Sequence, residues 1–264
     1  EFSGVPMPEE YAEQEDIRTS DVRTGNITTK VVRKFMQEIP ISAEMFADDQ
    51  VSVKGNTVSD MGRAARERKN QRAILDTYGD MFTGNVNVTP DGQTLASNSH
   101  LTLKGFTVDN LETGVASPDN LWAQVQALAN QKNQQGERGG HELRGIAAPF
   151  VLYKSLKEIL NSVAIANSAE NNLNIFETDF GEVAIKASTW LNSAYNSYAN
   201  ANTAYALISG NHFIQHGMRE EVSTDVIEPK YSKQDSWAYR IRYRHLPFIG
   251  SWTGVVGTTG AAAS

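Results

Sequence analysis

The chain contains no cysteine among its 264 residues. Disulfide bonds, thiolate nucleophiles and cysteine-ligated metal sites are therefore excluded, and synthesis in a reducing cytosol fits this composition. The sequence also has no apolar run approaching the ~20 residues of a membrane-spanning helix, and no signal peptide opens it. We therefore expect no membrane partner.

Basic charge is scarce as well. The 24 lysines and arginines are outnumbered by 31 aspartates and glutamates, which gives a net charge of -7. A dedicated DNA-binding role is therefore disfavoured, because such proteins neutralise phosphates with a basic surface. Hydrophobic residues make up 40% of the chain and charged residues 21%, which is the composition of a folded protein. The length suffices for one large domain or two small ones.

Three common catalytic motifs are missing from the sequence. There is no G-x-x-x-x-G-K-[ST] to bind phosphates, no G-x-G-x-x-G between a strand and a helix, and no G-x-S-x-G nucleophile elbow. Any enzymatic site would have to be assembled from scattered residues.

One stretch, "DGQTLASNSH", nevertheless contains the residue types of a catalytic triad. These are Asp91, Ser97, Ser99 and His100. Catalysis needs the nucleophile and the base to be held rigidly within hydrogen-bond reach, usually by distant segments. Here they share one connection that begins with the turn-forming sequence Pro-Asp-Gly. We interpret the stretch as a structural turn.

His212 and His216 have the i, i+4 spacing of two metal ligands on a helix. The metalloprotease pattern also requires a glutamate directly after the first histidine, and Phe213 stands there. Glycines flank the segment, which argues against a helix. We predict no metal site here.

Two further histidines have simpler interpretations. His141 and Glu142 are adjacent in a glycine-rich loop, and adjacent side chains point in different directions in most backbones. His245 is interpreted as a surface or interface residue. We predict that the chain has no catalytic, cofactor-binding or metal-binding residues.

Several segments have the apolar spacing of helices. Residues 49 to 82 keep apolar residues three to four positions apart around the charged run "RAARERKNQR", whose basic face we interpret as solvated. Ser117-Pro118-Asp119 combines a capping hydroxyl, a first-turn proline and an early carboxylate, which predicts a helix start. A buried strand over 146 to 152 is expected to lead into another helix.

The last third of the chain is rich in predicted strands. Residues 237 to 245 alternate strictly, with one apolar and one basic face: Trp237, Tyr239, Ile241 and Tyr243 against Arg240, Arg242 and Arg244. We expect the apolar face to be buried and the arginines to be neutralised by acidic groups of this chain or of a neighbour. Near the other end, residues 24 to 42 are interpreted as a hairpin.

The two ends of the chain have little to fold around. Residues 1 to 23 are polar and acidic with two prolines and cannot bury enough apolar area alone. They are interpreted as an arm that is either disordered or ordered against a neighbouring chain. The tail "GTTGAAAS" is expected to be flexible. Because no repeat or long linker divides the chain, two domains would be interleaved rather than sequential.

The succession of these segments resembles the major capsid proteins of tailed bacteriophages, which have the Hong Kong 97-type fold. The resemblance runs over residues 35 to 165, and more loosely to 255. It is carried, in order, by "IPISAEMFADDQ", "VSDMGRAARERKNQRAI", "DGQTLASNSH", "GFTVDNL", "LWAQVQALANQKNQQGER" and "PFVLYKSLKEILNS".

The resemblance implies an α+β fold divided into the family's parts. These are an N-terminal arm at 1–23, an extended loop at 24–48 with a start near 12 as an alternative, a peripheral domain with the spine helix at 49–114, an axial domain at 115–210, and a return to the peripheral domain with a flexible tail at 211–264.

The resemblance also implies a function. The chain would assemble with itself into pentamers and hexamers of an icosahedral head enclosing double-stranded DNA, which it would contact non-specifically. Charged rows such as the three arginines would set the register between neighbours. Expected partners are a portal, a scaffold or maturation protease, and decoration proteins. The protein would be no enzyme, would need no cofactor, and would be a virion component assembled in the bacterial cytoplasm.

Two chemical features of the family bear on particular residues. Many members lose an N-terminal scaffolding region to a phage protease, which is one explanation for Glu1 as the first residue. Some form lysine–asparagine cross-links, and Lys30 and Lys34 lie in the expected loop. Nothing in the sequence identifies their asparagine partner or an activating carboxylate, so we predict no cross-link.

Three alternatives stay open on the sequence alone. An encapsulin, which is a bacterial nanocompartment shell, would share the fold but enclose enzyme cargo. A soluble α+β hydrolase would use His100 or His141. A monomeric binding module would not assemble at all.

Overall fold

The computed structural model describes residues 24–42, 44, 47–48, 53–162, 175–180, 182–228 and 236–261. The arm expected at residues 1 to 23 and the last residues of the tail lie outside these ranges. The chain forms two compact units, each made from separated stretches of sequence. Unit 1 comprises Glu1–Thr28, Ile74–Ile214 and Ile249–Ser264, and unit 2 comprises Thr29–Ala73 and Gln215–Phe248.

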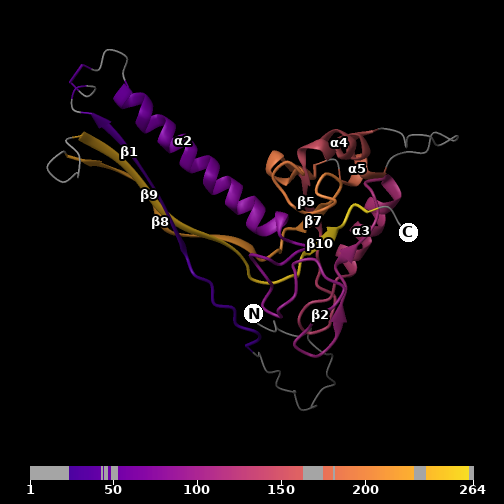
Figure 1. Ribbon diagram of the computed structural model, residues 1–264. Coiled ribbons are helices and arrows are strands. Elements are labelled where there is room, and N and C mark those ends of the chain that lie inside the picture. The colour runs from indigo at the N-terminus through magenta and orange to yellow at the C-terminus, as the bar shows by residue number, and fades with distance from the viewer. Residues whose placement is uncertain are drawn as a thin grey trace, which may run out of the picture. The chain divides into compact units, whose positions relative to one another are not determined.

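Unit 2 is one helix packed on one three-stranded sheet (Figure 1). The sheet contains β1 (Arg33–Ser42), β9 (Ser236–Ile249) and β8 (Ile214–Ile227), in that order. The helix is α2 (Val53–Ile74). Because β9 lies in the middle, the unit joins the early part of the chain to the late part.

The alternation predicted for residues 237 to 245 explains this packing. Tyr239, Ile241 and Tyr243 are buried on one face of β9 and contact Met61 and Ala65 of α2. The aromatic, β-branched face is thereby removed from water, and the prediction of a buried apolar face is confirmed for these three residues.

The hairpin predicted within residues 24 to 42 is wrong. Only β1 forms a strand in this region, and its partner is β9, with Arg33 opposite His245 and Ser42 opposite Ser236 in an antiparallel register. Strand propensity depends on neighbouring residues and predicted the strand itself. It could not predict the pairing partner, which is about two hundred residues away along the chain. Residues 12 to 23, which would have completed a longer hairpin, lie outside the described ranges.

The long helix is shorter at its C-terminal end than the spacing predicted. It changes to a π-helical turn, η1 (Leu75–Gly79), and the chain then leaves the helix. The carboxylate of Asp80 accepts hydrogen bonds from the backbone N–H groups of Asn85, Val86 and Asn87 at 2.7 to 2.8 Å. These bonds favour a compact loop over further helical turns, since short acidic side chains compete with helix by bonding local backbone.

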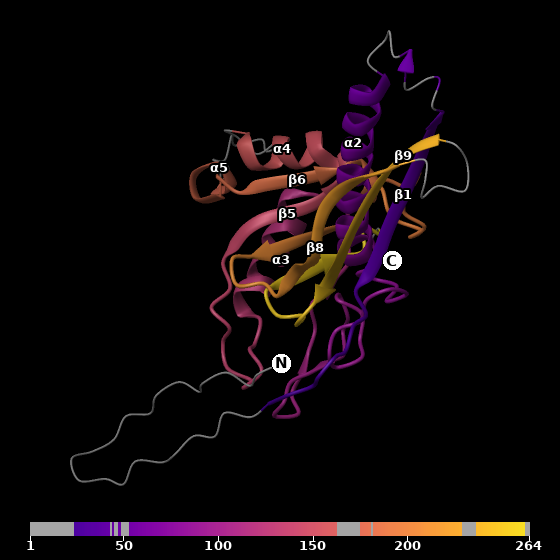
Figure 2. The same cartoon turned by 90° about the vertical axis from the view of Figure 1, so that its left-hand side faces the viewer.

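Unit 1 is built around a five-stranded sheet (Figure 2). Its strands, in spatial order, are β4 (Leu111–Glu112), β10 (Val255–Thr258), β7 (Tyr205–Ser209), β5 (Leu143–Pro149) and β6 (Ala184–Ser188). The β4–β10 and β5–β6 pairs are parallel, and the two pairs that involve β7 are antiparallel. Such a mixed sheet with helices is an α+β arrangement.

Helices and short connections complete unit 1. They are α3 (Pro118–Asn130), α4 (Tyr153–Asn161), α5 (Ile175–Phe180), the 3₁₀ turns η2 (Phe150–Leu152) and η3 (Thr189–Leu191), and the small hairpin of β2 (His100–Leu101) with β3 (Thr107–Val108). The predicted helix start at Ser117 is confirmed, since its side chain accepts a hydrogen bond from Asn120 N. The strand predicted over 146 to 152 begins earlier and ends at Pro149, which has no N–H to donate to a ladder.

The sheet of unit 1 is covered on both faces. Neighbouring residues of a strand point to opposite faces, and they divide accordingly between two apolar clusters. Leu207 and Val256 belong to one cluster with α3 and α4, whereas Ala206 and Val255 belong to another with Met81, Leu95 and Ile249. Unit 1 therefore has a two-sided core.

Candidate functional site

The structure brings Asp91 and His100 together inside unit 1. The Nδ1 atom of His100 lies 2.7 Å from Oδ2 of Asp91, and its Nε2 atom lies 3.2 Å from the carbonyl oxygen of Leu95. The side chain of His100 is 0% exposed and that of Asp91 is 3% exposed. Trp252 stacks on the imidazole, with the ring centroids 4.9 Å apart. Both ring nitrogens therefore face an oxygen acceptor within hydrogen-bond distance.

The serines of the same stretch do not join this pair. Ser97 and Ser99 bond to each other through their hydroxyls at 3.1 Å. Nucleophilic catalysis would require a serine hydroxyl on a free ring nitrogen of an accessible histidine. Here the nitrogens of His100 are occupied and the ring is buried, so the arrangement supports a structural role and leaves the absence of catalysis a prediction.

The electrostatics of Asp91 agree with a structural role. Burial by itself would raise the pKa of this carboxyl group. Hydrogen bonds from His100 and Thr89, together with the electrostatic attraction of His100, outweigh that effect and hold the pKa below its ordinary value. The turn predicted from Pro-Asp-Gly is present, since Gly92 N donates to Thr89 O at 2.9 Å and Gly92 has a φ of 84°.

Two histidines form a pair in unit 2. His216 Nε2 and His245 Nδ1 are 2.9 Å apart, and His245 is only 1% exposed. The interpretation of His245 as a surface residue is wrong, because it continues the buried face of β9 and stacks near Phe35.

This environment disfavours the charged form of the pair. Burial, followed by the charges of His216, Lys69 and Arg72, lowers the pKa of His245 to about 4. Burial and then Lys69 also lower the pKa of His216. Both rings are therefore neutral at neutral pH, and one donates to the other.

His212 and His216 do not lie on a helix, so their i, i+4 spacing does not place them on one helical face. His216 lies on the extended strand β8, and His212 precedes it in a turn where Nδ1 contacts the Ser209 carbonyl oxygen at 2.8 Å. Within the described ranges, no three histidine, aspartate or glutamate residues are arranged to hold a metal ion. None of the helices in those ranges combines the length and apolar character needed to cross a bilayer.

The row of arginines on β9 is matched by acidic groups of the same chain. Arg240 donates from Nε and Nη2 to Glu38 Oε2 of β1 at 3.0 and 2.8 Å. Arg242 lies 3.1 Å from Glu220 and 3.6 Å from Asp225 of β8. The prediction that acidic groups neutralise this face is confirmed for these two arginines, within the chain itself.

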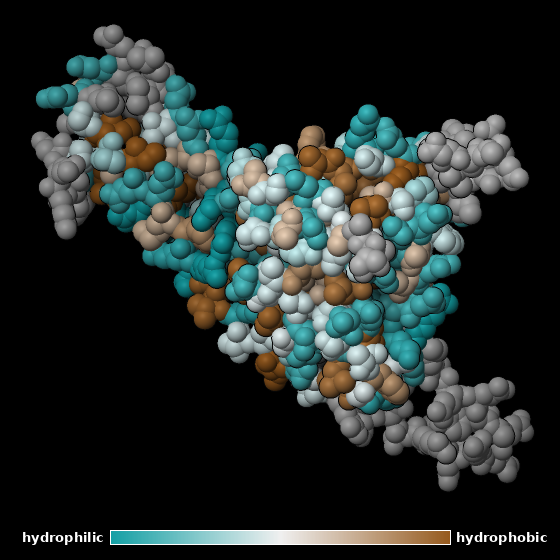
Figure 3. Space-filling view, turned by 45° about the vertical axis from the view of Figure 1, so that its right-hand side comes forward, coloured by the Kyte–Doolittle hydropathy of each residue, from teal (hydrophilic) through white to brown (hydrophobic). Residues whose placement is uncertain are grey.

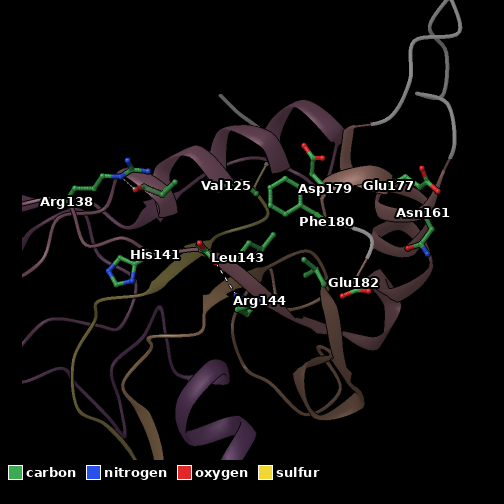
Figure 4. Close-up of a pocket in the computed structure, with 13 residues that line it drawn as sticks. Val125, Arg138, His141, Leu143, Arg144, Asn161, Glu177, Asp179, Phe180 and Glu182 are labelled. Atoms are coloured by element: carbon green, nitrogen blue, oxygen red, sulfur yellow. Dashed lines mark hydrogen bonds and ion pairs between the residues drawn. The ribbon is translucent and has the colours of Figure 1, made fainter.

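A groove of about 960 Å³ lies in unit 1 beside α3 and α5 (Figure 4). Val125, Leu143 and Phe180 form an apolar centre, and Glu177, Asp179 and Glu182 lie around it. His141 also lines the groove; it is 7% exposed, neither ring nitrogen has a hydrogen-bond partner, and burial lowers its pKa. Its neighbour Glu142 is exposed and pairs with Arg144 at 3.2 Å.

Neither this groove nor a second apolar surface, at the other end of β5, was predicted from the sequence. Phe150, Val151 and Tyr153 were expected in a buried strand and the inner face of a helix, but they are 57%, 57% and 39% exposed. The available signal was Pro149, which marks the end of the strand just before them. The groove itself had no sequence signal, because its lining comes from segments far apart in the chain.

Comparison with known proteins identifies the family. A family model described as phage capsid protein matches residues 26–257. None of the curated proteins searched matches the chain.

Solved structures share the fold at low sequence identity. The capsid of an empty GTA particle has a TM-score of 0.56 at 10% identity, over 95% of this chain and 79% of that one. The Mycobacterium phage Adephagia structure gives 0.52 at 13% identity, over 89% and 73%. The capsid of bacteriophage JBD30 gives 0.51 at 17% identity, over 72% and 84%.

The family match spans most of the sequence, and the fold is that expected from the resemblance. The α+β architecture is therefore the Hong Kong 97-type fold. The chain belongs to the phage capsid protein family and is a major capsid shell protein.

Proposed function

We propose that this subunit packs with copies of itself into pentamers and hexamers, and that these close into an icosahedral head around the double-stranded DNA of a tailed bacteriophage. The family match over residues 26–257 carries the proposal. The shell would act by association rather than by turnover.

The surface of unit 2 supports this function. Met218, Val222 and Val226 are exposed on β8, and their even spacing places them on one face of the strand. β8 is also an edge strand of its sheet, and a long edge with apolar residues favours association. Figure 3 shows apolar side chains gathered in patches on an otherwise polar surface.

We also propose that unit 2 forms the core of the peripheral domain and that unit 1 forms most of the axial domain. α2 would be the spine helix. Residues 74–114, which the sequence analysis assigned to the peripheral domain, belong to the compact unit 1. An arm before β1 would extend over a neighbouring subunit.

The remaining partners follow from the shell. A portal, a scaffold or maturation protease, and decoration proteins would each contact it, and the packaged DNA would be touched non-specifically. A net charge of -7 would keep the inner wall from adhering to phosphates. Assembly would take place in the bacterial cytoplasm.

Electron microscopy of the expressed protein tests the proposal. We expect closed shells or capsomers, and a protein that stays a monomer at high concentration would contradict it. The contents of native particles separate two kinds of shell, since nuclease-resistant DNA indicates a phage head and a co-purifying enzyme indicates an encapsulin. An activity abolished by replacing His100 and His141, with assembly intact, would instead support a hydrolase.

A further inference from the structure

The exposed apolar residues of unit 1 and its groove have complementary chemistry. We call the exposed residues Phe150, Val151 and Tyr153, with Lys154 and Lys157 after them, the knob. We propose that the knob of one copy enters the groove of a neighbouring copy, so that the two surfaces form one contact between subunits. The inference rests on the proposed shell function and names the surfaces that would join subunits into rings.

The side chains of the knob are ordered against each other and exposed to solvent in the isolated chain. The rings of Phe150 and Tyr153 stack at 6.1 Å with an interplanar angle of 3°, so little side-chain entropy would be lost on docking. Removing a large apolar side chain from water is favourable, so docking of these exposed side chains would stabilise the contact. Large, rigid aromatic side chains of this kind commonly dominate interface energies.

The groove offers what the knob requires. Val125, Leu143 and Phe180 provide an apolar floor. His141 also lines the groove, but its ring nitrogens are buried, so the contact with a neighbour would come from the apolar floor and the charged rim.

The charges of the two surfaces are also complementary. The groove is lined by four carboxylates and by the two arginines Arg138 and Arg144. Arg144 pairs with Glu142, and among the described residues Glu177, Asp179 and Glu182 form no ion pair with a basic side chain, so the groove keeps an acidic excess. On the knob side, Lys157 has no acidic partner in the described ranges, and Lys154 has only a loose, highly exposed contact with Glu158 at 3.7 Å. Opposite charges on facing surfaces select a partner and fix its orientation.

Geometry prevents a subunit from filling its own groove. The chain leaves the groove at Leu143 and Arg144, runs along β5 to the knob, and returns along α4 to Asn161 at the groove. A seven-residue strand spans roughly 20 Å and a nine-residue helix roughly 13 Å. The knob and the groove therefore lie at opposite ends of the β5–α4 layer, and the occupant is a second copy.

Such a contact is head-to-tail. Each subunit uses its knob on one neighbour and its groove on the other, and contacts of this type close into rings when the rotation permits. Rings, rather than two-fold dimers, are therefore expected as the first product of this contact.

Two full-length variants test the contact. F150S/V151S removes the knob and D179K/E182K reverses the charge of the groove. Every replaced side chain is at the surface or on the rim, so thermal unfolding is expected to match that of the parent chain. V115S, which replaces another exposed valine of unit 1, is the matched control. By sedimentation velocity, each double variant should lose at least tenfold in assembled material, and V115S should assemble normally.

Mixing the two variants gives the decisive result. The knob of the groove variant fits the intact groove of the knob variant, and no further contact of this type is possible. We expect a one-to-one dimer from the mixture and rings only from the parent chain. Normal assembly of either variant, or a mixture without dimers, would overturn the inference. If D179K/E182K loses thermal stability but assembles normally, the groove is filled by another part of the same chain. That result would also overturn the inference. A parent chain that never assembles would instead contradict the proposed function.

Discussion

The two units are stabilised in different ways. Unit 1 buries apolar residues on both faces of its sheet, and its connection from β-turn to hairpin is anchored by the buried Asp91–His100 pair. In unit 2 only one face of the sheet is apolar, and it packs against one helix. The other face of that sheet holds arginines in partly exposed ion pairs.

This difference separates a complete core from an incomplete one. A two-sided sheet excludes water from all its central side chains, whereas a sheet with one covered face leaves half of its area to solvent or to a neighbour. The exposed apolar row on β8 lies in unit 2. We infer that unit 1 contributes most of the stability of the free subunit and that unit 2 gains most from assembly.

Removing one large apolar side chain from each core should give the largest contrast. Leu207→Ala in unit 1 should cost about 4 kcal/mol, because its site is enclosed and can't collapse, and Met61→Ala in unit 2 about 2 kcal/mol, because a one-sided layer relaxes more easily. Denaturant unfolding of unassembled subunits measures both. Equal losses would remove the distinction between the cores.

The buried pair of unit 1 should come next. Asp91→Asn keeps the shape but removes the charge that His100 faces, so the free energy of unfolding should fall by about 3 kcal/mol. Asp109→Asn is the control, since Asp109 is exposed and its bond to Leu111 N can be kept by the amide. A loss below 1 kcal/mol for Asp91→Asn would show that the pair does not anchor the connection.

Acid should act on unit 2 through its histidine pair. The folded pKa of His245 is about 4 against an ordinary value of 6.5. The unfolded chain therefore binds more protons between these values, and stability falls as the pH is lowered from about 6.5 to 4. We expect the melting temperature to drop by roughly 5 °C over this window.

The variant H216Q/H245Q isolates that effect. It should show a smaller decrease over the same window, and the remainder should come from His141 in unit 1, whose pKa burial also lowers. An unchanged pH dependence in the variant would exclude the pair as its cause.

The surface ion pairs of unit 2 should matter least. Arg240→Gln should cost about 0.5 kcal/mol, because an exposed pair gains little in water even with two hydrogen bonds to one carboxylate. Unfolding at low and high salt measures this, and the difference between the variant and the parent should shrink as salt rises. A cost above 2 kcal/mol would mean that the ion pairs, and not the apolar face, hold the sheet together.

Local features of the fold were predictable from the sequence. The cap at Ser117 and the proline after it act within one helical turn, and the alternation in β9 depends only on which residues share a face. Each signal is contained in a few neighbouring residues, so each survived in the structure.

Features that join distant segments were not predictable. Nothing local pairs β1 with β9, and the ion pair of Glu38 with Arg240 spans 202 positions. The groove depends on α3, β5 and α5 meeting in space. His245 is a different case, because the alternation of β9 already placed it on the buried face with Tyr243, and extending the pattern by two residues would have predicted its burial.

The order of the strands has a consequence for synthesis. β9 occupies the middle of one sheet, and β10 lies between β4 and β7 in the other. A chain that has left the ribosome only as far as β8 lacks the strand that joins β1 to β8 and the strand that joins β4 to β7, so each sheet stays divided until its late strand emerges. Products truncated before β9 would then expose strand edges that the longer chain covers, and exposed edges favour pairing with other chains.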